Sequence, residues 1–497
     1  MAAERQLDGV REGDTAGVVD VVVVGAGPAG LAAAVEAATG GARVVVLDDQ
    51  PRPGGQYWRQ GPAGPGRYHH DRAGWDRLAE GLRGQVAAGR VDHRPDHQVW
   101  RLDGPGDGPG DGHRGALVVV HAVTGGRGAD GEVPVTLRAR AVVVATGAHD
   151  RVLPFPGWEL PGVLTPGAVQ ALLKEHGVVA GRRVVVGGSG PFLLPVATAL
   201  LQAGAQVPAL VEAGDGRGWL RGWRGLAAGT DRLGEAAGYA AVLARHRVRP
   251  RLRHAVVAAH GNDRVEAVTV ARLDAGGAIV PGSGRQVAAD TVAVGWGFTA
   301  RVDLALQAGA VAVPSPDGGT AVAADPFGRT AVPGVLVAGE LLGVGGAPLA
   351  VLTGRLAGTA AAAHALGRPA PPPAAVADLL RRRRRATAFA HTLATAHPVP
   401  PGWPGWLDDA TVVCRCEEVR LGRLHEAIDV LGATDPRTAK LLTRTGMGWC
   451  QGRSCAEATS TLVAVRCGTA PEPGWNVRPV AVPLTLDALA AGDDDPS

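Results

Sequence analysis

The sequence is poor in features whose abundance would point to a class of function. Lysine occurs only at Lys174 and Lys440 among 50 basic residues, and the formal net charge is only +3. A net charge this small gives no electrostatic reason to expect nucleic-acid binding. The excess of arginine, alanine and glycine fits GC-rich coding better than it fits a function.

Long hydrophobic runs are missing as well. The run from Val18 to Val24 is interrupted by Asp20 and is far shorter than the roughly 20 residues that cross a bilayer. The first seventeen residues hold charged side chains and no apolar core, so no secretory signal is expected. We therefore expect a cytoplasmic protein with no direct membrane span, at most peripheral to the inner membrane through a partner.

Cysteine is rare, and the five cysteines are confined to the last fifth of the chain. A disulfide scaffold would not cluster in this way in a large intracellular protein. The clustering instead predicts a metal site in a separate module. The cysteines are Cys414, Cys416, Cys450, Cys455 and Cys467.

Glycine, by contrast, is abundant, with 74 residues, and fills two dinucleotide-type motifs. In the first, VVVVGAGPAGLAAA, a strand is expected before the glycines and a helix after them. Gly25 permits the tight turn, Gly27 lets the backbone approach a pyrophosphate, and Gly30 lets the helix pack close to the strand. Asp48 ends the next expected strand, where its carboxylate can bind a ribose hydroxyl. A nucleotide site is therefore predicted, and an empty tight turn is the alternative.

Two later segments favour FAD as the nucleotide of this first site. Gly55 and Gln56 belong to a flexible segment, Gly54–Gln56, that can pass near a flavin. Much later, the stretch VPGVLVAGE ends an expected strand at Gly339 and Glu340, and a helix follows. A carboxylate there can reach the ribitol, and helix-start amides can stabilise negative charge on a reduced flavin. An ordinary strand-to-helix turn is the alternative.

The stretch VVVGGSGPFLLPVATALL repeats the design with one departure. Gly188 and Gly190 fill the first two glycine positions, but Leu193 stands where the third glycine would be. Glu212 ends the next expected strand, and its carboxylate would favour a free 2′-hydroxyl, hence NAD over NADP. The site is expected to hold NAD or ATP, or to be a fold kept for architecture. No C-x-x-C pair lies near either motif, which argues against a flavin-dependent disulfide reductase.

The cysteine spacing favours an iron–sulfur cluster over zinc. In an extended segment Cys414 and Cys416 point to the same side, with their Cα atoms about 7 Å apart. Cys450 and Cys455 complete a set of four thiolates, which suits either a [2Fe-2S] cluster or zinc. A C-x-C pair is a poor zinc pattern, so a [2Fe-2S] cluster is predicted. Cys467 is expected to be a buried apolar residue.

The ordered set of motifs resembles a known family. GAGPAG, DDQPRPGGQ, ATGAHDRVLPFPGW, LPGVLTPGAVQ, GGSGPFLLP, AGELLGVGGAPLA, CRCEEV and GMGWCQGRSC occur in this order. Together they resemble the FAD/NAD-fold α (A/B-type) subunits of amino-acid dehydrogenase complexes. Members are the opine oxidase A subunit, the cyanide-forming glycine dehydrogenase B subunit and the hydroxyproline dehydrogenase α subunit, with the sarcosine oxidase α subunit more distant.

The resemblance implies an α/β flavoprotein with two dinucleotide-binding domains and a small C-terminal BFD-like [2Fe-2S] domain. The expected parts are a flexible N-terminus (1–17), an FAD-binding Rossmann-like domain in two pieces (18–150 and 296–367), an inserted NAD-type Rossmann domain (151–295), a linker (368–407), the [2Fe-2S] domain (408–470) and a tail (471–497). The residues implied at FAD are Gly25, Gly27, Pro28, Ala29, Gly30, Asp48, Gly55, Gln56, Thr146, Gly147, Gly339 and Glu340. Glu340 departs from the aspartate common in the wider flavoprotein group.

The resemblance also implies a function. The chain would be the electron-transfer subunit of an amino-acid or amine dehydrogenase complex acting on CH–NH or CH–NH2 donors. Its implied partners are a smaller flavoprotein subunit of the glycine/D-amino-acid-oxidase type, with FMN at the subunit interface, and a ferredoxin or quinone acceptor. The alternatives are a self-contained NAD(P)H-dependent acceptor reductase and a non-catalytic assembly subunit with a structural nucleotide. No catalytic proton-transfer residue is assigned, because the cofactors carry the chemistry; His149 is expected to be a solvated loop histidine.

Overall fold

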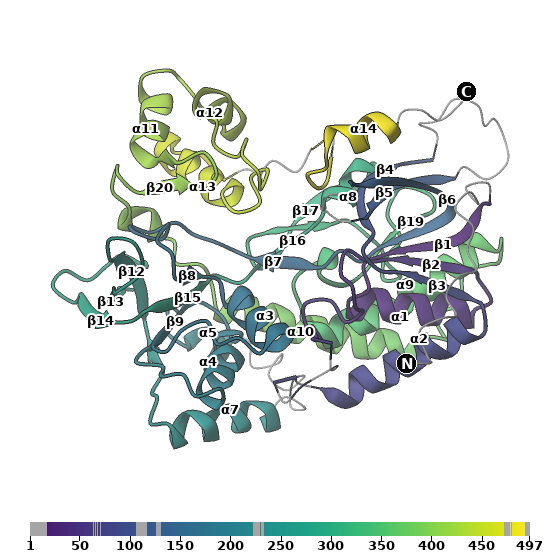
Figure 1. Cartoon of the computed structure of the whole chain (residues 1–497), viewed down its shortest axis with the longest axis horizontal. Helices are drawn as coiled ribbons and strands as arrows, with labels where there is room; N and C mark the ends of the chain where they lie inside the picture. Colours follow the sequence, from purple (N-terminus) through teal and green to yellow (C-terminus); the bar gives the residue numbers. More distant parts are fainter. Residues whose placement is uncertain are drawn as a thin grey trace.

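The computed structural model describes residues 17–62, 64, 66, 68–69, 71–105, 117–125, 131–221, 229, 233–471, 478 and 480–492. The predicted flexible N-terminus (1–16 of it), most of the glycine-rich stretch at 103–115 and the acidic end from residue 493 lie outside the described residues. Two sheet-containing lobes lie side by side, and a small helical module sits above the lobe that carries the second glycine motif (Figure 1). No helix in the described part of the chain is long and apolar enough to span a membrane.

The first lobe is built on a seven-stranded sheet that follows the first glycine motif. The parallel strands are β1 (Val19–Val24), β2 (Val44–Leu47), β3 (Val91–Arg94), β6 (Val133–Val144) and β19 (Val335–Val337). β5 (Val118–Thr124) and β4 (Gln98–Asp103) continue the sheet in antiparallel fashion from β6. β19 comes almost 200 residues after β6 and still pairs with it, so the sheet is assembled from two separated pieces of chain.

The valine run of β1 is buried on both faces, as expected for a central parallel strand. Val21 and Val23 pack with helices α1 (Pro28–Thr39) and α9 (Ala347–Ala365). Val22 and Val24 face the opposite side, against β19 and the short helix α8 (Asp303–Gln307). α2 (Arg72–Ala87) packs outside α1, its N-terminus capped by Asp71.

The second lobe repeats the architecture around the second glycine motif. Its parallel sheet has the order β11-β10-β9-β15-β8. These strands are β8 (Val163–Leu164), β9 (Val184–Gly188), β10 (Leu210–Glu212), β11 (Arg251–Leu252) and β15 (Thr291–Gly295). Helices α3 (Pro166–His176), α4 (Leu193–Gln202), α5 (Arg217–Arg221) and α7 (Leu233–Arg245) surround the sheet, and β12 (His254–His260), β13 (Ala267–Arg272) and β14 (Arg285–Ala288) form an antiparallel sheet.

Two short strands join the lobes. β7 (Ala148–Asp150) leaves the first lobe, and β16 (Phe298–Ala300) returns to it, and the two pair in antiparallel fashion. They cross the middle of the molecule between the sheets (Figure 1). The second lobe is therefore inserted into the first, as the sequence predicted; β17 (Ala312–Pro314), β18 (Thr320–Val322) and η2 (Gly339–Leu342) complete the first lobe after the return.

The segment predicted as a linker holds a twenty-residue helix, α10 (Ala377–Ala396). The basic run Arg381–Arg385 lies within this helix, and all of its side chains except that of Arg383 are exposed. The helix forms because arginine, alanine and leucine, which favour helices, follow the proline-rich stretch without interruption. Only four of its side chains are buried, and these hold it to the lobes: Leu379, Ala390, Thr392 and Ala396.

The cysteine module shares a hydrophobic core with the second lobe. It contains η3 (Trp403–Trp406), β20 (Val412–Cys414), β21 (Val419–Arg420), α11 (Leu421–Asp429), α12 (Pro436–Thr443) and α13 (Ala456–Cys467). Leu424 and Leu462 of the module belong to the same buried cluster as Trp158 and Trp296 of the second lobe. Cys467 is partly buried against that cluster. The predicted tail then returns to the first lobe, where α14 (Leu486–Gly492) packs Ala488 near Trp100.

Helices α1 and α9 approach closely because α9 carries glycines at the contact. A Cβ atom on Gly354 would overlap the carbonyl oxygen of Ala29, and one on Gly358 would overlap that of Ala33. The absence of side chains lets the two backbones touch behind the first glycine turn. This contact fixes the start of α1, where the predicted pyrophosphate amides lie.

We expect Gly358→Ala to destabilise the protein by about 1–3 kcal/mol, because the added methyl group must push the helices apart. Gly84, exposed in the middle of α2, has no atom within 4 Å of the position that an added methyl group would take, and it is the matched control. Gly84→Ala should stabilise by about 0.5–1 kcal/mol through helix propensity alone. The midpoints of thermal unfolding measure both effects; equal midpoints for the two variants would contradict the close packing.

Candidate cofactor sites

The first glycine turn joins β1 to α1 at the carboxyl edge of the sheet. Gly25 has φ +99°, and a Cβ on it would lie 2.6 Å from the carbonyl oxygen of Ala145. A Cβ on Gly30 would overlap the carbonyl oxygen of Gly25. Gly27 is the N-cap of α1, and Pro28 is its first residue, so the free amides at the helix start face the edge where a phosphate would bind.

The segment Gly54–Gln56 lies directly against this turn. Gly55 has φ +58°, and a Cβ on it would lie 2.7 Å from the Cα atom of Gly27. The amide of Gly54 donates to the carbonyl oxygen of Ala26 at 2.8 Å. The glycine turn and the segment Gly54–Gln56 are therefore in direct backbone contact. They lie too close together for a side chain to fit between them.

Asp48 offers a buried acceptor at the end of β2. Its side chain is 4% exposed, and its Oδ2 atom has no hydrogen-bond partner among the described residues. Burial, with the neighbouring charge of Asp49, raises its pKa from 3.8 to about 7. A buried oxygen without a donor is costly in the chain alone, and a ribose hydroxyl is a donor of the right chemistry. The residue therefore fits the adenosine end of FAD.

The turns after β6 and β19 complete the same edge. Thr146 follows β6 and donates its hydroxyl to the carbonyl oxygen of Arg301 at 2.7 Å, and Gly147 has φ +70°. Gly339 follows β19, and a Cβ on it would lie 2.9 Å from the Cβ atom of Ala29. The predicted FAD residues of the β1, β6 and β19 turns thus gather around the start of α1.

Glu340 holds the start of α9. Its Oε2 atom accepts from the Gly345 amide at 2.7 Å and its Oε1 atom from the Gly346 amide at 3.0 Å. Burial raises its pKa to about 7 against the lowering effect of these two hydrogen bonds. Helix-start amides were expected to stabilise a reduced flavin, but the amides of Gly345 and Gly346 already donate to this carboxylate. Contact of Glu340 with the ribitol stays a prediction.

The four predicted cluster ligands lie close together in two pairs. Cys414 ends β20 and is hydrogen-bonded through its side chain to Cys455, the N-cap of α13, and this contact lowers the pKa of Cys414 to about 6. Cys416 is hydrogen-bonded in the same way to Cys450, and burial raises its pKa. The first pair is buried and the second is nearer the surface. A [2Fe-2S] cluster takes two cysteine sulfurs on each iron, so two pairs fit its chemistry.

No group of three or more histidine, cysteine or acidic side chains in the described ranges has an arrangement that could hold a single metal ion. The loop before Cys450 nevertheless packs closely against Cys416. A Cβ on Gly448 would overlap the Cβ atom of Cys416, and the backbone amides of Gly446 and Glu417 are hydrogen-bonded to the sulfur of Cys414. Amides directed at a thiolate stabilise its charge, as a cluster ligand requires.

A buried ion pair attaches the cysteine module to the crossing strands. The Nε atom of Arg151 lies 2.8 Å from Oε2 of Glu457, two residues after Cys455, and its Nη2 atom lies 3.3 Å from Oδ2 of Asp317. No sequence pattern indicates this contact, because isolated charged residues so far apart in the chain carry no signal of their pairing. It fixes α13 against the lobe that holds the first glycine turn.

His149 lies beside this ion pair and contacts the cysteine loop. Its Nε2 atom lies 3.1 Å from the carbonyl oxygen of Arg453, which is between Cys450 and Cys455. Burial lowers the pKa of His149 to about 4. The expectation of a solvated loop histidine is therefore wrong, because His149 lies in β7 and contacts the loop between Cys450 and Cys455. Only Ala148 separates the Thr146–Gly147 turn from this contact.

The second glycine turn is engaged by the chain itself. Glu212, at the end of β10, accepts from the Gly190 amide at 3.0 Å, so the predicted residues of this site do come together. Gly188 has φ +134°, and a Cβ on it would overlap the carbonyl oxygen of Gly295. Leu193 is buried as the first residue of α4. A helix that starts at Leu193 begins later after its turn than α1 does after Gly25.

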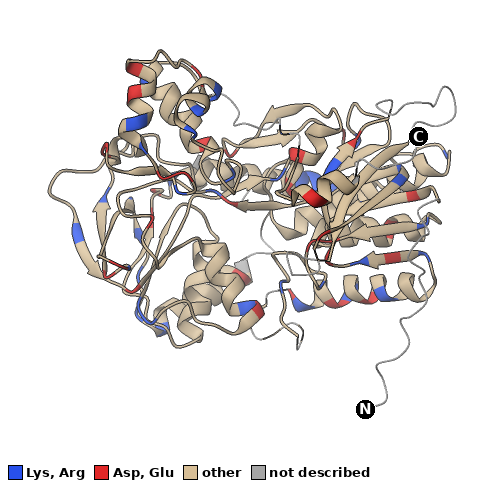
Figure 2. Cartoon of the chain, turned by 45° about the horizontal axis from the view of Figure 1, so that its top comes forward, with Lys and Arg blue, Asp and Glu red and all other residues tan. Residues whose placement is uncertain are grey.

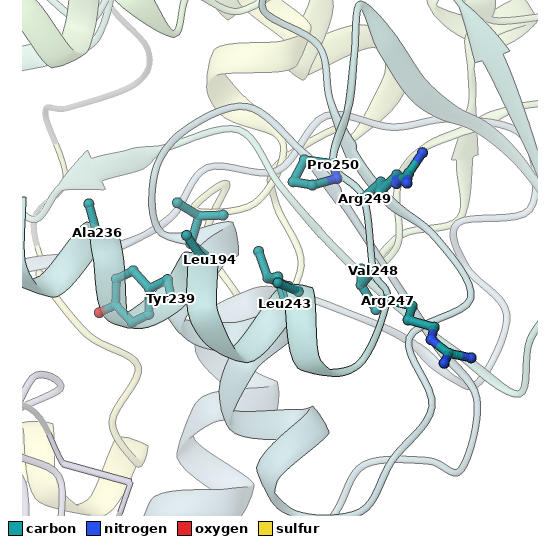
Figure 3. A pocket seen from close by; sticks show the side chains of 10 residues that line it. Leu194, Ala236, Tyr239, Leu243, Arg247, Val248, Arg249 and Pro250 are labelled. Carbon is teal, nitrogen blue, oxygen red and sulfur yellow. The ribbon is translucent and has the colours of Figure 1, made fainter.

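A cavity among the described residues lies away from both glycine turns and from the cysteines. It has a volume of about 760 Å³ and lies between α4 and α7, with Leu194, Tyr239 and Leu243 on its wall and Arg247 at one side (Figure 3). None of the predicted site residues lines it. Acidic and basic residues are interspersed along the ribbon of both lobes, and neither kind gathers on one side of the molecule in this view (Figure 2).

The comparisons with known proteins agree with these sites. Residues 19–365 match the pyridine nucleotide-disulphide oxidoreductase family, and residues 412–464 match the BFD-like [2Fe-2S] binding domain. The chain belongs to the pyridine nucleotide-disulphide oxidoreductase family and carries a [2Fe-2S] domain in addition. The two matches confirm FAD and the [2Fe-2S] cluster as cofactors; the individual ligand residues stay predictions.

Individual relatives are similar over almost the whole chain. The opine oxidase A subunit of Agrobacterium tumefaciens is 33% identical over 91% of this chain and 86% of that protein. The hydrogen cyanide synthase subunit HcnB of Pseudomonas protegens is 30% identical over 96% and 98%. The solved L-proline dehydrogenase of P. horikoshii shares the fold, with a TM-score of 0.64 at 22% identity over 95% of this chain and 79% of that one. The predicted family resemblance is confirmed.

For Asp48→Asn we expect opposite effects on stability and on FAD affinity. Because the pKa of Asp48 in the folded chain is raised from 3.8 to about 7, the FAD-free protein loses stability as pH rises between these values. The amide removes that loss, worth about 1–3 kcal/mol at pH 8. It also weakens FAD binding by roughly 10- to 100-fold, through the weaker hydrogen bond to the ribose.

Urea unfolding at several pH values and FAD titration of the FAD-free protein measure the two effects. Asp92→Asn, which changes an exposed carboxylate on the adjacent strand β3, is the control and should change neither. Tight FAD binding together with an unchanged pH dependence in Asp48→Asn would remove Asp48 from the site.

The iron content should fall from about two atoms per chain toward zero when any one of the four predicted ligands is replaced by serine. These ligands are Cys414, Cys416, Cys450 and Cys455. Cys467→Ser should keep its iron, because Cys467 lies against the hydrophobic core and away from the paired thiols. Iron and acid-labile sulfide are measured on anaerobically purified protein. Zinc in place of iron, or loss of iron only in the Cys467 variant, would contradict the assignment.

Proposed function

We propose that this chain is the electron-transfer subunit of an amino-acid or amine dehydrogenase complex. The observation that carries the proposal is the direct contact between the two cofactor regions. β7 leaves the Thr146–Gly147 turn, and within a few residues it contacts the loop between Cys450 and Cys455. The relatives at 30–33% identity, the opine oxidase A subunit and HcnB, are subunits of such assemblies by name, which supports the proposal.

The residues of this chain bind and orient the two groups and exclude water between them. When bound, FAD and the cluster supply two-electron and one-electron transfer, respectively. Gly25, Gly27 and Gly55 would let the chain approach the pyrophosphate of FAD, and Asp48 would accept a hydrogen bond from its ribose. The ion pair between Arg151 and Glu457 keeps the loop between Cys450 and Cys455 against the turn that follows β6. No side chain is needed as an acid or base for this relay.

The substrate is then oxidised in another subunit. A smaller flavoprotein of the glycine/D-amino-acid-oxidase type is the expected partner, with FMN at the interface between the two. Opines, proline, hydroxyproline, glycine and sarcosine are the candidate substrates, and a ferredoxin or the quinone pool is the acceptor. The complex would be cytoplasmic, or peripheral to the inner membrane through a partner.

The second candidate function, a self-contained NAD(P)H:acceptor reductase, is favoured by the carboxylate of Glu212 at the end of β10. It is opposed by the hydrogen bonds that this carboxylate already makes within the chain. An assembly subunit with a structural nucleotide is opposed by the [2Fe-2S] domain, which such a role does not need.

The test is anaerobic reduction with and without the partner. The smaller flavin-oxidase-like subunit is co-expressed with this chain, and each candidate amino acid is added in turn. We expect one of them to bleach the flavin and give a reduced-cluster EPR signal in the complex and not in this chain alone. Rapid reduction of the isolated chain by NADH would instead establish the reductase function.

A further inference from the structure

A pyridine nucleotide in the second lobe would need the carboxyl edge of β9 and β10. Its pyrophosphate takes the amides of the glycine turn, and its ribose hydroxyls take the carboxylate at the end of the second strand. Both must be free of hydrogen bonds to the rest of the chain. In this chain the corresponding groups are the turn Gly188–Gly190 and Glu212.

The carboxylate of Glu212 is fully used inside the protein. Its Oε2 atom accepts from the Gly190 amide at 3.0 Å. Its Oε1 atom accepts from the Gly214 amide at 3.0 Å and from the Ser189 hydroxyl at 3.2 Å. The negative charge therefore occupies the amide that a phosphate would take, and it would repel the phosphate as well.

The chain itself covers the same edge. We call residues 396–398, the last residue of α10 and the two after it, the closing segment. Pro398 accepts from the Ser189 hydroxyl at 3.2 Å through its carbonyl oxygen. The Nδ1 atom of His397 lies 3.4 Å from Oε1 of Glu212, and its ring meets Trp219 of α5 edge-on at 5.4 Å between centroids.

The backbone of the closing segment lies close to two glycines. A Cβ on Gly218 would overlap the Cα atom of Ala396, and one on Gly214 would lie 3.2 Å from its carbonyl oxygen. α10 packs along α5 to deliver the segment to this position (Figure 1). The segment thus lies over the ends of both β9 and β10, where the adenosine of a dinucleotide would be.

We infer that the second dinucleotide fold holds the closing segment in place of a pyridine nucleotide, with Glu212 as the residue that anchors it. The first lobe provides the internal comparison. Asp48 is the counterpart of Glu212, and its buried Oδ2 atom has no hydrogen-bond partner among the described residues. The carboxylate of the same motif therefore has an oxygen without a donor in the first lobe, whereas both of its oxygens are hydrogen-bonded in the second.

The closure has a structural consequence for the cysteine module. The closing segment leads within a few residues to Trp403 and Trp406, which are buried in the core shared by the second lobe and the module. The indole of Trp406 donates to the carbonyl oxygen of Gly277 at 2.9 Å. Glu212 therefore acts as a positioning residue for the segment that attaches the [2Fe-2S] domain.

The first test is ligand binding to the FAD-loaded protein, in which the first site is already filled. NADH, NADPH and ATP are titrated by calorimetry under anaerobic conditions, up to about 1 mM, the range of very weak ligands. We expect no saturable binding. Saturable binding of NADH or NADPH to the native protein would overturn the inference, whether or not the flavin is reduced.

The second test follows the closing segment by amide hydrogen exchange. Glu212→Ala should raise exchange in residues 396–402 at least about fivefold, because it removes the carboxylate that lies against His397 and accepts from the Ser189 hydroxyl. Glu235→Ala, which removes an exposed carboxylate from α7 in the same lobe, should not. Ser189→Ala removes the hydroxyl that lies within hydrogen-bond distance of both Pro398 and Glu212, and it serves if the first variant folds poorly.

Unchanged exchange in both the Glu212 and the Ser189 variants would also overturn the inference, since neither residue would then hold the segment. The outcome is separate from that of the proposed function. Partner-dependent reduction can succeed while NADH binds, and the closing segment can hold while no amino acid reduces the complex.

Discussion

The architecture depends on the buried contact that holds the cysteine module against the crossing strands. Arg151, 6% exposed, is neutralised by Glu457 from the module and Asp317 from the first lobe. A buried guanidinium without both carboxylates would be strongly destabilising, so the three parts that supply these charges must assemble together. The hydrophobic core that the module shares with the second lobe adds a second, non-directional attachment. The cysteine loop therefore has one position relative to the Thr146–Gly147 turn.

The two dinucleotide folds show how the same local pattern serves two ends. In each, a buried parallel strand, a glycine turn and an acidic residue follow in order, although the second glycine has φ -73° in the first turn and φ +119° in the second. The difference lies in what covers the edge. Asp48 has a buried oxygen without a hydrogen-bond donor. Glu212, in contrast, accepts hydrogen bonds from Ser189, Gly190 and Gly214. A motif therefore predicts the turn, and the surroundings decide whether a ligand can enter.

The sequence predicted the parts of the structure that rest on local rules. The glycine turns, the grouping of the four cysteines and the family followed from spacing and motif order, and the inserted second lobe followed from the resemblance. The pairing of Cys414 with Cys455 and of Cys416 with Cys450 was not predicted. The contacts of Arg151, His149 and Glu212 could not be predicted, because each joins residues brought together only by the packing of separate lobes. The helix α10 was missed for a different reason: a proline-rich stretch followed by an arginine run is typical of a linker, although the residues after Pro373 favour a helix.

The central claim is that electrons pass between the flavin and the cluster within one chain. Laser-flash photoreduction of the isolated, fully loaded protein tests it most directly, with the flavin and cluster absorbances followed at several protein concentrations. The account predicts that the flavin is reoxidised as the cluster is reduced, at a rate independent of protein concentration. A rate proportional to concentration, or a cluster that stays oxidised while the flavin remains reduced, would contradict it.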